Sequence, residues 1–153
     1  MRKRTKRKVW ALIDPLTHAI VGASITHRDK LDKLRMLEYS ALEAMTKGQG
    51  TVTDWRTLVD VLNLSETMAR HNIGKDEVLP VCQKAQDALH QAAERYQKTL
   101  KMGLSGEGIK AVRDLIEYAD LQQSSISRSE FEKYIKKTKD YIKSNNDLVV
   151  EII

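Results

Sequence analysis

A run of basic residues near the start of the chain is the strongest candidate for chemistry. Its six cations lie within seven positions: Arg2, Lys3, Arg4, Lys6, Arg7 and Lys8. Such a cluster attracts polyanions because binding releases condensed counterions, which gives salt-sensitive, sequence-independent affinity for nucleic acid. The same charges would attract an acidic protein or lipid surface, or would serve only solubility. We expect a disordered basic arm over residues 1–8, with nucleic acid as its leading partner.

A second candidate follows the serine-rich segment 124–129. Ser127 and Glu130 form a capping-box pattern, which predicts the start of a helix. The basic residues of this helix would form a cationic surface: Arg128, Lys133, Lys136 and Lys137. The segment resembles the start of a helix-turn-helix recognition helix, which offers polar groups to base edges. However, Ser125 stands where glycine is usual and Ser124 where an apolar residue is usual, so a capped bundle helix is the simpler alternative.

The third candidate is a polar triplet, Asp87, His90 and Glu94, whose spacing of three and four places it on one helix face. A histidine between two carboxylates could supply half of a metal site, or a general base oriented by a carboxylate. A di-iron bundle would need matching Glu and Glu-x-x-His patterns on other helices. Glu117 and Asp120 share a face but have no histidine beside them. We therefore expect a solvated polar face, with no metal and no cofactor.

Nucleophilic and phosphate-binding motifs have no support in the sequence. The single cysteine, Cys82, excludes an internal disulfide and a Cys-based zinc site, and its place on an apolar stripe predicts a small buried hydrophobe. Gly103, Gly106 and Gly108 lack the lysine and serine spacing of a phosphate-binding loop. We expect a protein without catalytic residues, which is not an enzyme.

The elements that must position these candidates are helices, because apolar residues recur at spacings of three and four along most of the chain. The expected ranges are 26–48, 53–71, 76–102, 105–122 and 127–145. Thr26 and Asp29 form a capping-box pattern that predicts the first start. Gly48, Gly74 and Gly103 are expected to end the first three helices. Residues 9–25 are expected to be irregular, with Trp10 as an anchor.

Inward positions follow from the same spacing. On the first helix they would be Leu34, Leu37, Ala41, Ala44 and Met45. Pro80 is expected in the first turn of the third helix, where it is tolerated because its missing N–H has no partner to lose.

Length and charge place these helices in one domain. The chain has 153 residues, of which 41% are hydrophobic and 31% charged, as is typical of a globular protein. Its net charge of +5 comes from the arm, because residues 9–153 contain 20 basic and 21 acidic residues. We expect an all-α single domain over residues 9–153, a bundle of about five helices.

Export and membrane insertion are not favoured. Asp14 and Pro15 interrupt the first apolar run, which is therefore too short for the hydrophobic region of a signal peptide. Nor is there an apolar stretch near the roughly 18 residues of a membrane span. We expect a cytoplasmic protein without a membrane partner.

A short apolar segment over residues 147–153 suggests a contact with another chain. Its apolar residues are Leu148, Val149, Val150, Ile152 and Ile153. They could form a docking strand for a host protein or a contact with a second copy of the chain.

Several segments together carry a family resemblance. They are the basic start, Trp10, PLTHAI (15–20), GA (22–23), Asp54-Trp55 with Leu58 and Asp60, DLIEY (114–118) and SISRSE (125–130). They resemble uncharacterised small proteins of proteobacterial phages, prophages and plasmids, some of which are labelled Fis-like regulators. The resemblance covers most of the chain. It implies a mobile-element context and transfers no catalytic residue.

These observations predict a non-enzymatic accessory or regulatory protein of a mobile element. The arm would supply affinity for nucleic acid and the last helix would supply geometry. The alternative is a protein-interaction module, such as a phage-encoded inhibitor or adaptor that binds a host protein. The near-zero charge of residues 9–153 suits this alternative.

Overall fold

Five α-helices account for most of the described chain. A computed structural model describes the backbone of residues 17–145 and the side chains of residues 31–144. The helices are α2 (Thr17–Thr46), α3 (Val52–Arg70), α4 (Lys75–Thr99), α5 (Gly106–Ser124) and α6 (Arg128–Asn145). The predicted all-α bundle is therefore confirmed. The basic arm, Trp10 and the C-terminal apolar segment lie outside the described residues.

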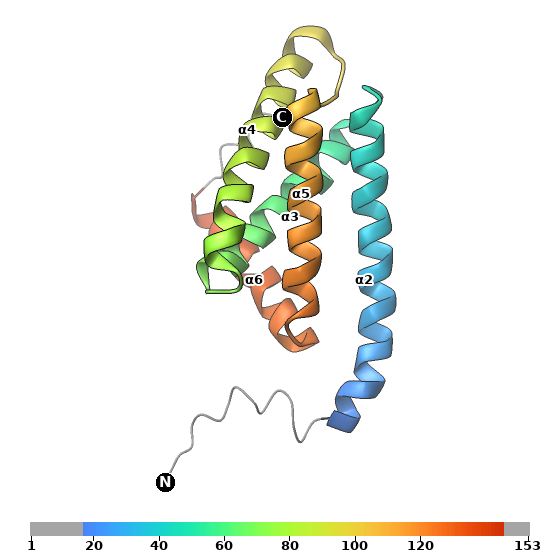
Figure 1. The fold of residues 1–153 in the computed structure, drawn as a ribbon, viewed down its shortest axis with the longest axis vertical. Coiled ribbons are helices and arrows are strands. Elements are labelled where there is room, and N and C mark those ends of the chain that lie inside the picture. Colours follow the sequence, from blue (N-terminus) through green and yellow to red (C-terminus); the bar gives the residue numbers. More distant parts are fainter. Residues whose placement is uncertain (1–16, 146–153) are drawn as a thin grey trace.

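The arrangement of the helices places α3 at the centre. In Figure 1, α2, α4 and α5 run roughly side by side, and α3 crosses behind them. α3 contacts each of the other four helices, and α4 and α5 pack closely on each other. α6 packs mainly on α3, with a smaller contact to α2. The two outermost helices of the sequence, α2 and α6, thus lie on a central group of three.

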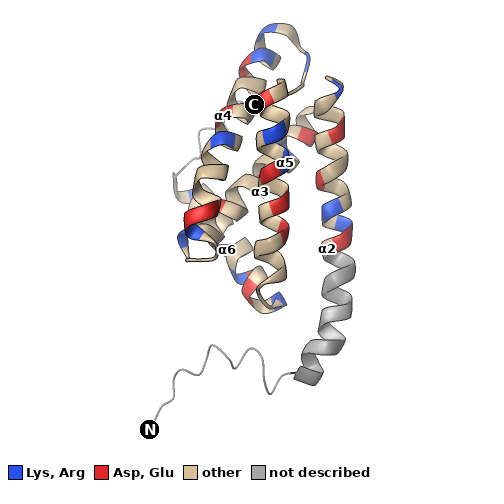
Figure 2. Cartoon of the chain, in the orientation of Figure 1, with Lys and Arg blue, Asp and Glu red and all other residues tan. Residues whose placement is uncertain are grey.

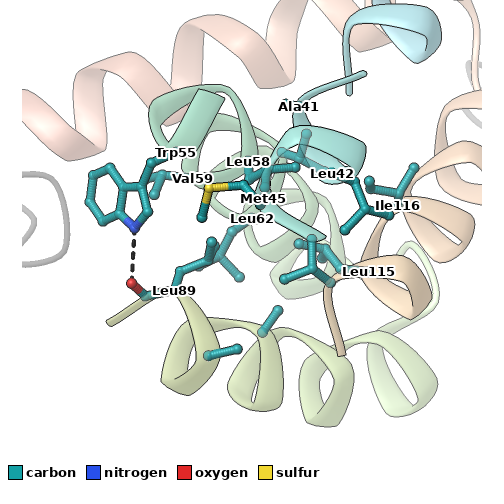
Figure 3. Packing of buried hydrophobic residues seen from close by; sticks show 14 of the residues in the cluster. Ala41, Leu42, Met45, Trp55, Leu58, Val59, Leu62, Leu89, Leu115 and Ile116 are labelled. Carbon is teal, nitrogen blue, oxygen red and sulfur yellow. Dashed lines mark hydrogen bonds between the residues drawn. The ribbon is translucent and has the colours of Figure 1, made fainter. Parts of the chain in front are cut away.

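One hydrophobic core joins α2, α3, α4 and α5. Trp55 lies fully inside it, and its indole Nε1 donates a hydrogen bond to the carbonyl oxygen of Leu89 at 2.9 Å (Figure 3). Buried alanines on α4 let α5 approach closely. A Cβ added to Gly108 would lie 3.2 Å from the Cβ of Ala88. Small side chains at this crossing therefore set the distance between α4 and α5.

Serine side chains start two helices at the predicted places. The Ser105 Oγ accepts a hydrogen bond from the Gly108 amide at 3.1 Å, and the Ser127 Oγ accepts one from the Glu130 amide at 3.2 Å. Each satisfies an amide that has no partner within its helix. α3 begins slightly earlier than predicted, because Thr51 rather than Thr53 caps it in a full capping box.

The start of α2 was predicted wrongly. The helix begins at Thr17, so Thr26 and Asp29 lie within it and the expected irregular segment is helical from residue 17 onward. A capping-box pattern marks the start of a helix only where the preceding residues are not helical. Here they are helical, and no proline interrupts residues 17–46. The inward face also differs, because Leu37 is 57% exposed whereas Glu38 is buried.

The ends of α3 and α4 use other residues than the predicted glycines. Asn72 has the left-handed conformation (φ 70°) after α3, and its amide donates to the Ala69 carbonyl at 2.9 Å. Gly74 instead caps the start of α4. Leu100, with φ 60°, ends α4 three residues before Gly103. Pro80 lies beyond the first turn of α4, not within it.

Gly103 has a packing role in place of the predicted helix stop. An added Cβ would lie 2.9 Å from the Gly48 Cα and 3.2 Å from the Met45 carbonyl oxygen. Next to this crossing, the Gly50 amide donates to the Met102 carbonyl at 3.0 Å. The segments after α2 and α4 are therefore in direct backbone contact. Gly48 itself follows α2 with φ 71°, as predicted.

Candidate nucleic-acid interface

The outward face of α6 carries a concentration of positive charge. Phe131, Tyr134 and Thr138 are buried and hold the helix on the bundle. Five exposed lysines lie on its other sides: Lys133, Lys136, Lys137, Lys139 and Lys143. We call these five lysines the α6 lysines. With Arg128 included, the helix has six basic residues and three acidic ones.

The α6 lysines keep their charges available to a ligand. Among the described side chains, no acidic group lies within 4 Å of any of the five ammonium groups. Arg128, by contrast, pairs with Glu132, with Nε 3.2 Å from Oε2. Of the four predicted binding residues on this helix, Lys133, Lys136 and Lys137 are therefore exposed cations, and Arg128 is partly neutralised.

At the position predicted for a recognition helix, the structure has α6, a bundle helix capped by Ser127. The Ser125 amide donates to the Gln122 carbonyl at 3.1 Å, and Ser127 caps α6 after a short turn. α6 then leaves α5 and packs on α3. The exposed α6 lysines begin in its second turn, so the first turn contributes little charge to this surface.

The rest of the bundle has no comparable excess of charge. Residues 17–124 contain 14 basic and 15 acidic residues. Figure 2 shows both signs on α2, α4 and α5. Local pairs also cancel charge, such as Lys110 with Asp114 at 2.9 Å. The cationic face is thus a property of α6 rather than of the whole bundle.

A groove runs between the C-terminal half of α3 and α6, beside the α6 lysines. Its volume is about 370 Å³. α3 contributes Asn63 and Arg70, His71 follows directly after α3, and α6 contributes Lys137 and Tyr141. We call it the α3–α6 groove. Sequence reasoning found only Lys137 in it, because the pairing of these two helices is a tertiary contact.

A histidine at one end of the groove is held by both helices. The Nδ1 of His71 lies 2.8 Å from the Thr67 carbonyl oxygen, and its Nε2 lies 3.4 Å from the Nζ of Lys137. A neutral imidazole satisfies both contacts by donating from Nδ1 and accepting at Nε2. Its ring also lies 5.3 Å from that of Tyr134. His71 therefore contacts Thr67 of α3 and Lys137 of α6.

One of the residues that line the groove has a buried amide without a partner among the described groups. Asn63 is only 8% exposed, and its Nδ2 makes no hydrogen bond with any described group. Tyr141, which also lines the groove, is 59% exposed. The Arg70 guanidinium is held at the side by Glu66, with Nη2 2.6 Å from Oε2. The groove thus combines a buried donor, an exposed aromatic ring and a fixed cation.

The polar triplet on α4 forms no compact centre. The Nε2 of His90 lies 3.6 Å from Glu94, whereas Asp87 accepts a hydrogen bond from Gln83 at 3.3 Å. Asp87 also lines a groove between α4 and α5, together with Lys84 and Lys110. Within the part of the chain that the structure describes, no group of three or more His, Cys, Asp or Glu side chains is placed to hold a metal ion.

A buried acid lies where α2 packs on α5. Glu38 is 2% exposed, and burial, reinforced by nearby Asp120, raises its pKa to about 8. Arg35 binds Asp120, with Nε 2.9 Å from Oδ1. The sequence contained a sign of this burial, because Glu38 lies seven residues from both Leu31 and Met45 on the inward stripe.

Cys82 is buried, as predicted, and burial raises its pKa to about 11, so its thiol stays protonated at neutral pH.

None of the described helices combines the length and the apolar character needed to cross a membrane. Compared with protein-family models, with curated proteins and with solved structures, the chain matches none.

Proposed function

We propose that this protein is a non-enzymatic accessory or regulatory protein that associates with nucleic acid through its basic arm and the α6 lysines. The observation that carries the proposal is the set of five exposed lysines on one helix, without acidic partners among the described side chains, on an otherwise balanced bundle. The mobile-element context rests on the sequence resemblance alone.

The physical basis is the release of counterions. Each ammonium group that contacts a phosphate displaces a condensed cation, so the affinity depends steeply on salt. The arm, residues 2–8, contributes six charges. The α6 lysines contribute a surface whose position is fixed by the packing of α6 on α3. The arm therefore supplies most of the affinity, and α6 orients the bundle on the polymer.

A fluorescence-anisotropy titration at several salt concentrations tests this proposal. The probes are duplex DNA, single-stranded DNA and RNA. One full-length variant has the six arm cations replaced by glutamine, and a second carries K133Q, K136Q and K137Q. Each lost phosphate contact should reduce the slope of log affinity against log salt by about 0.7 to 0.9.

The matched control replaces three exposed lysines elsewhere. K84Q, K98Q and K101Q remove the same total charge from α4 and the residues after it. We expect this variant to bind nearly as the wild type does. If it weakens binding as much as the α6 variant, α6 has no special role. If the wild type binds none of the three polymers at low salt, the proposal is wrong.

A second candidate function is a protein-interaction module. Met36 and Leu37 on α2 and Leu121 on α5 are exposed large apolar side chains, which are common at protein contacts. A host protein or a second copy of this chain would cover them. Sedimentation of the wild type and of an M36S/L37S variant separates these possibilities, because loss of a self-associated form identifies the second copy.

A further inference from the structure

We propose that the α3–α6 groove holds one unstacked base of a single-stranded nucleic acid, so that the protein prefers single strands to duplexes. The inference rests on the proposed association with nucleic acid and makes the polymer more specific. The groove volume of about 370 Å³ is within the usual range of ligand sites, roughly 300–1,000 Å³.

The lining of the groove includes a buried hydrogen-bond donor that has no acceptor among the described groups. Asn63 Nδ2 is buried and unpartnered among the described groups. Buried polar groups are nearly always hydrogen-bonded, so an unpartnered amide in a residue that lines the groove points to an acceptor that the ligand brings. Carbonyl oxygens and ring nitrogens on the edges of unpaired bases are such acceptors. In a duplex most of these edges are occupied by pairing.

The wall of the groove offers a surface for stacking. Tyr141 lines the groove and exposes more than half of its side chain. Single-stranded nucleic acids bind proteins by stacking their bases on aromatic rings, which tolerates any base sequence. Tyr141 also lies one helical turn after Lys137, so a base on the ring would have its phosphate near that ammonium group.

The charges of the groove favour a base inside and phosphates outside. Among its lining residues, Arg70 and Lys137 are matched by Glu66 and Asp140. The lining of the groove therefore carries no net excess of positive charge. Outside the groove, α6 presents cations without acidic partners among the described side chains, such as Lys133, which suit the sugar-phosphate chain.

The test compares a short single-stranded oligonucleotide with the duplex of the same sequence, using the full chain. We expect Y141A to weaken single-strand binding about tenfold and to leave duplex binding nearly unchanged. Y141F should retain the wild-type preference, because the ring remains. Y39A is the matched control, since Tyr39 is exposed on α2 and does not line the groove.

Asn63 provides a readout that a merely structural residue would not give. N63L removes an unpartnered buried amide, so thermal stability should be kept or raised while single-strand affinity falls. A measurement without any variant is the NMR resonance of the Asn63 side-chain amide. This resonance should shift when the single-stranded oligonucleotide is added and stay in place with the duplex.

The outcomes separate the two proposals. If both polymers bind equally and the Asn63 amide does not shift at saturation, the groove is not a base site, although the proposed function stands. If neither polymer binds, the proposed function fails first. A tenfold loss in Y141A, with no loss in Y39A and a shifted Asn63 resonance, supports the base site.

Discussion

At the scale of single residues, Glu38 should make stability depend on pH. Its pKa is raised from 4.5 to about 8 by burial, so between these values the unfolded chain releases a proton that the folded chain keeps. The free energy of unfolding should therefore fall as the pH rises through this window, by up to about 1.4 kcal/mol per pH unit. E38Q should remove this decrease and be more stable than the wild type at pH 8. Urea unfolding at several pH values measures both.

The control for this prediction is E43Q. Glu43 is on the same helix but exposed, where it pairs with Lys47 at 2.9 Å. E43Q should change the free energy of unfolding little, and this free energy should still fall between pH 4.5 and 8. A wild type whose stability is flat across this window would contradict the burial of an acid at position 38.

Two glycines at the same end of the bundle should respond oppositely to alanine. A Cβ at Gly103 would meet the Gly48 Cα at 2.9 Å, so G103A should destabilise the protein by about 1–3 kcal/mol. At Gly106, in the first turn of α5, nothing lies within 4 Å of an added Cβ. G106A should stabilise by up to about 1 kcal/mol, because alanine restricts the unfolded chain. Thermal unfolding of the pair checks the order, and equal effects would contradict the close backbone crossing.

Residue types alone did not reveal the most unusual positions. Glu38 and Asn63 are polar, and such residues are mostly exposed, so composition favours the surface for both. The spacing of Glu38 from Leu31 and Met45 hints at its burial, but the packing of α2 on α5 is what buries it, and the packing of α3 on α6 makes Asn63 part of a groove. The exposed lysines of α6 could be predicted, because they lie off the apolar stripe of that helix.

At the scale of helices, Pro80 should cost stability. It lies inside α4 beyond the first turn, so it has no amide to donate to the carbonyl of Asp76. P80A should restore that hydrogen bond and stabilise the protein by about 1–2 kcal/mol, after allowing for the freer unfolded chain. K84A, one turn further along the exposed side of α4, should change stability by less than about 0.5 kcal/mol. A P80A protein less stable than the wild type would mean that the proline has a packing role.

Helix boundaries differ in how well the sequence predicts them. Ser105 and Ser127 follow clear breaks in the apolar pattern, and both cap helices where expected. The Thr26 side chain could cap a helix in the same way, but Thr26 lies inside α2, which is already helical before this residue. The end of α3 depends on Asn72 in a left-handed conformation, which asparagine adopts less often than glycine. Local patterns thus predict helices well and their ends less well.

At the scale of the whole molecule, one core should give one unfolding transition. Trp55 is fully buried between α3 and α4, and Trp10 is the only other tryptophan. In a W10F variant, tryptophan fluorescence reports on the core alone, while far-UV circular dichroism reports on all helices. We expect the two denaturation midpoints to coincide. Separate midpoints would show that α2 or α6 unfolds independently of the core.

The central position of α3 also has a consequence for the route of folding. α3, α4 and α5 are consecutive in the chain and pack on one another, so their contacts close short loops at low entropic cost. α2 and α6 then dock from the two ends onto helices that already exist. A chain with this topology folds from its middle outward. Its transition state should contain the α4–α5 contact, and the α3–α6 groove should be completed last.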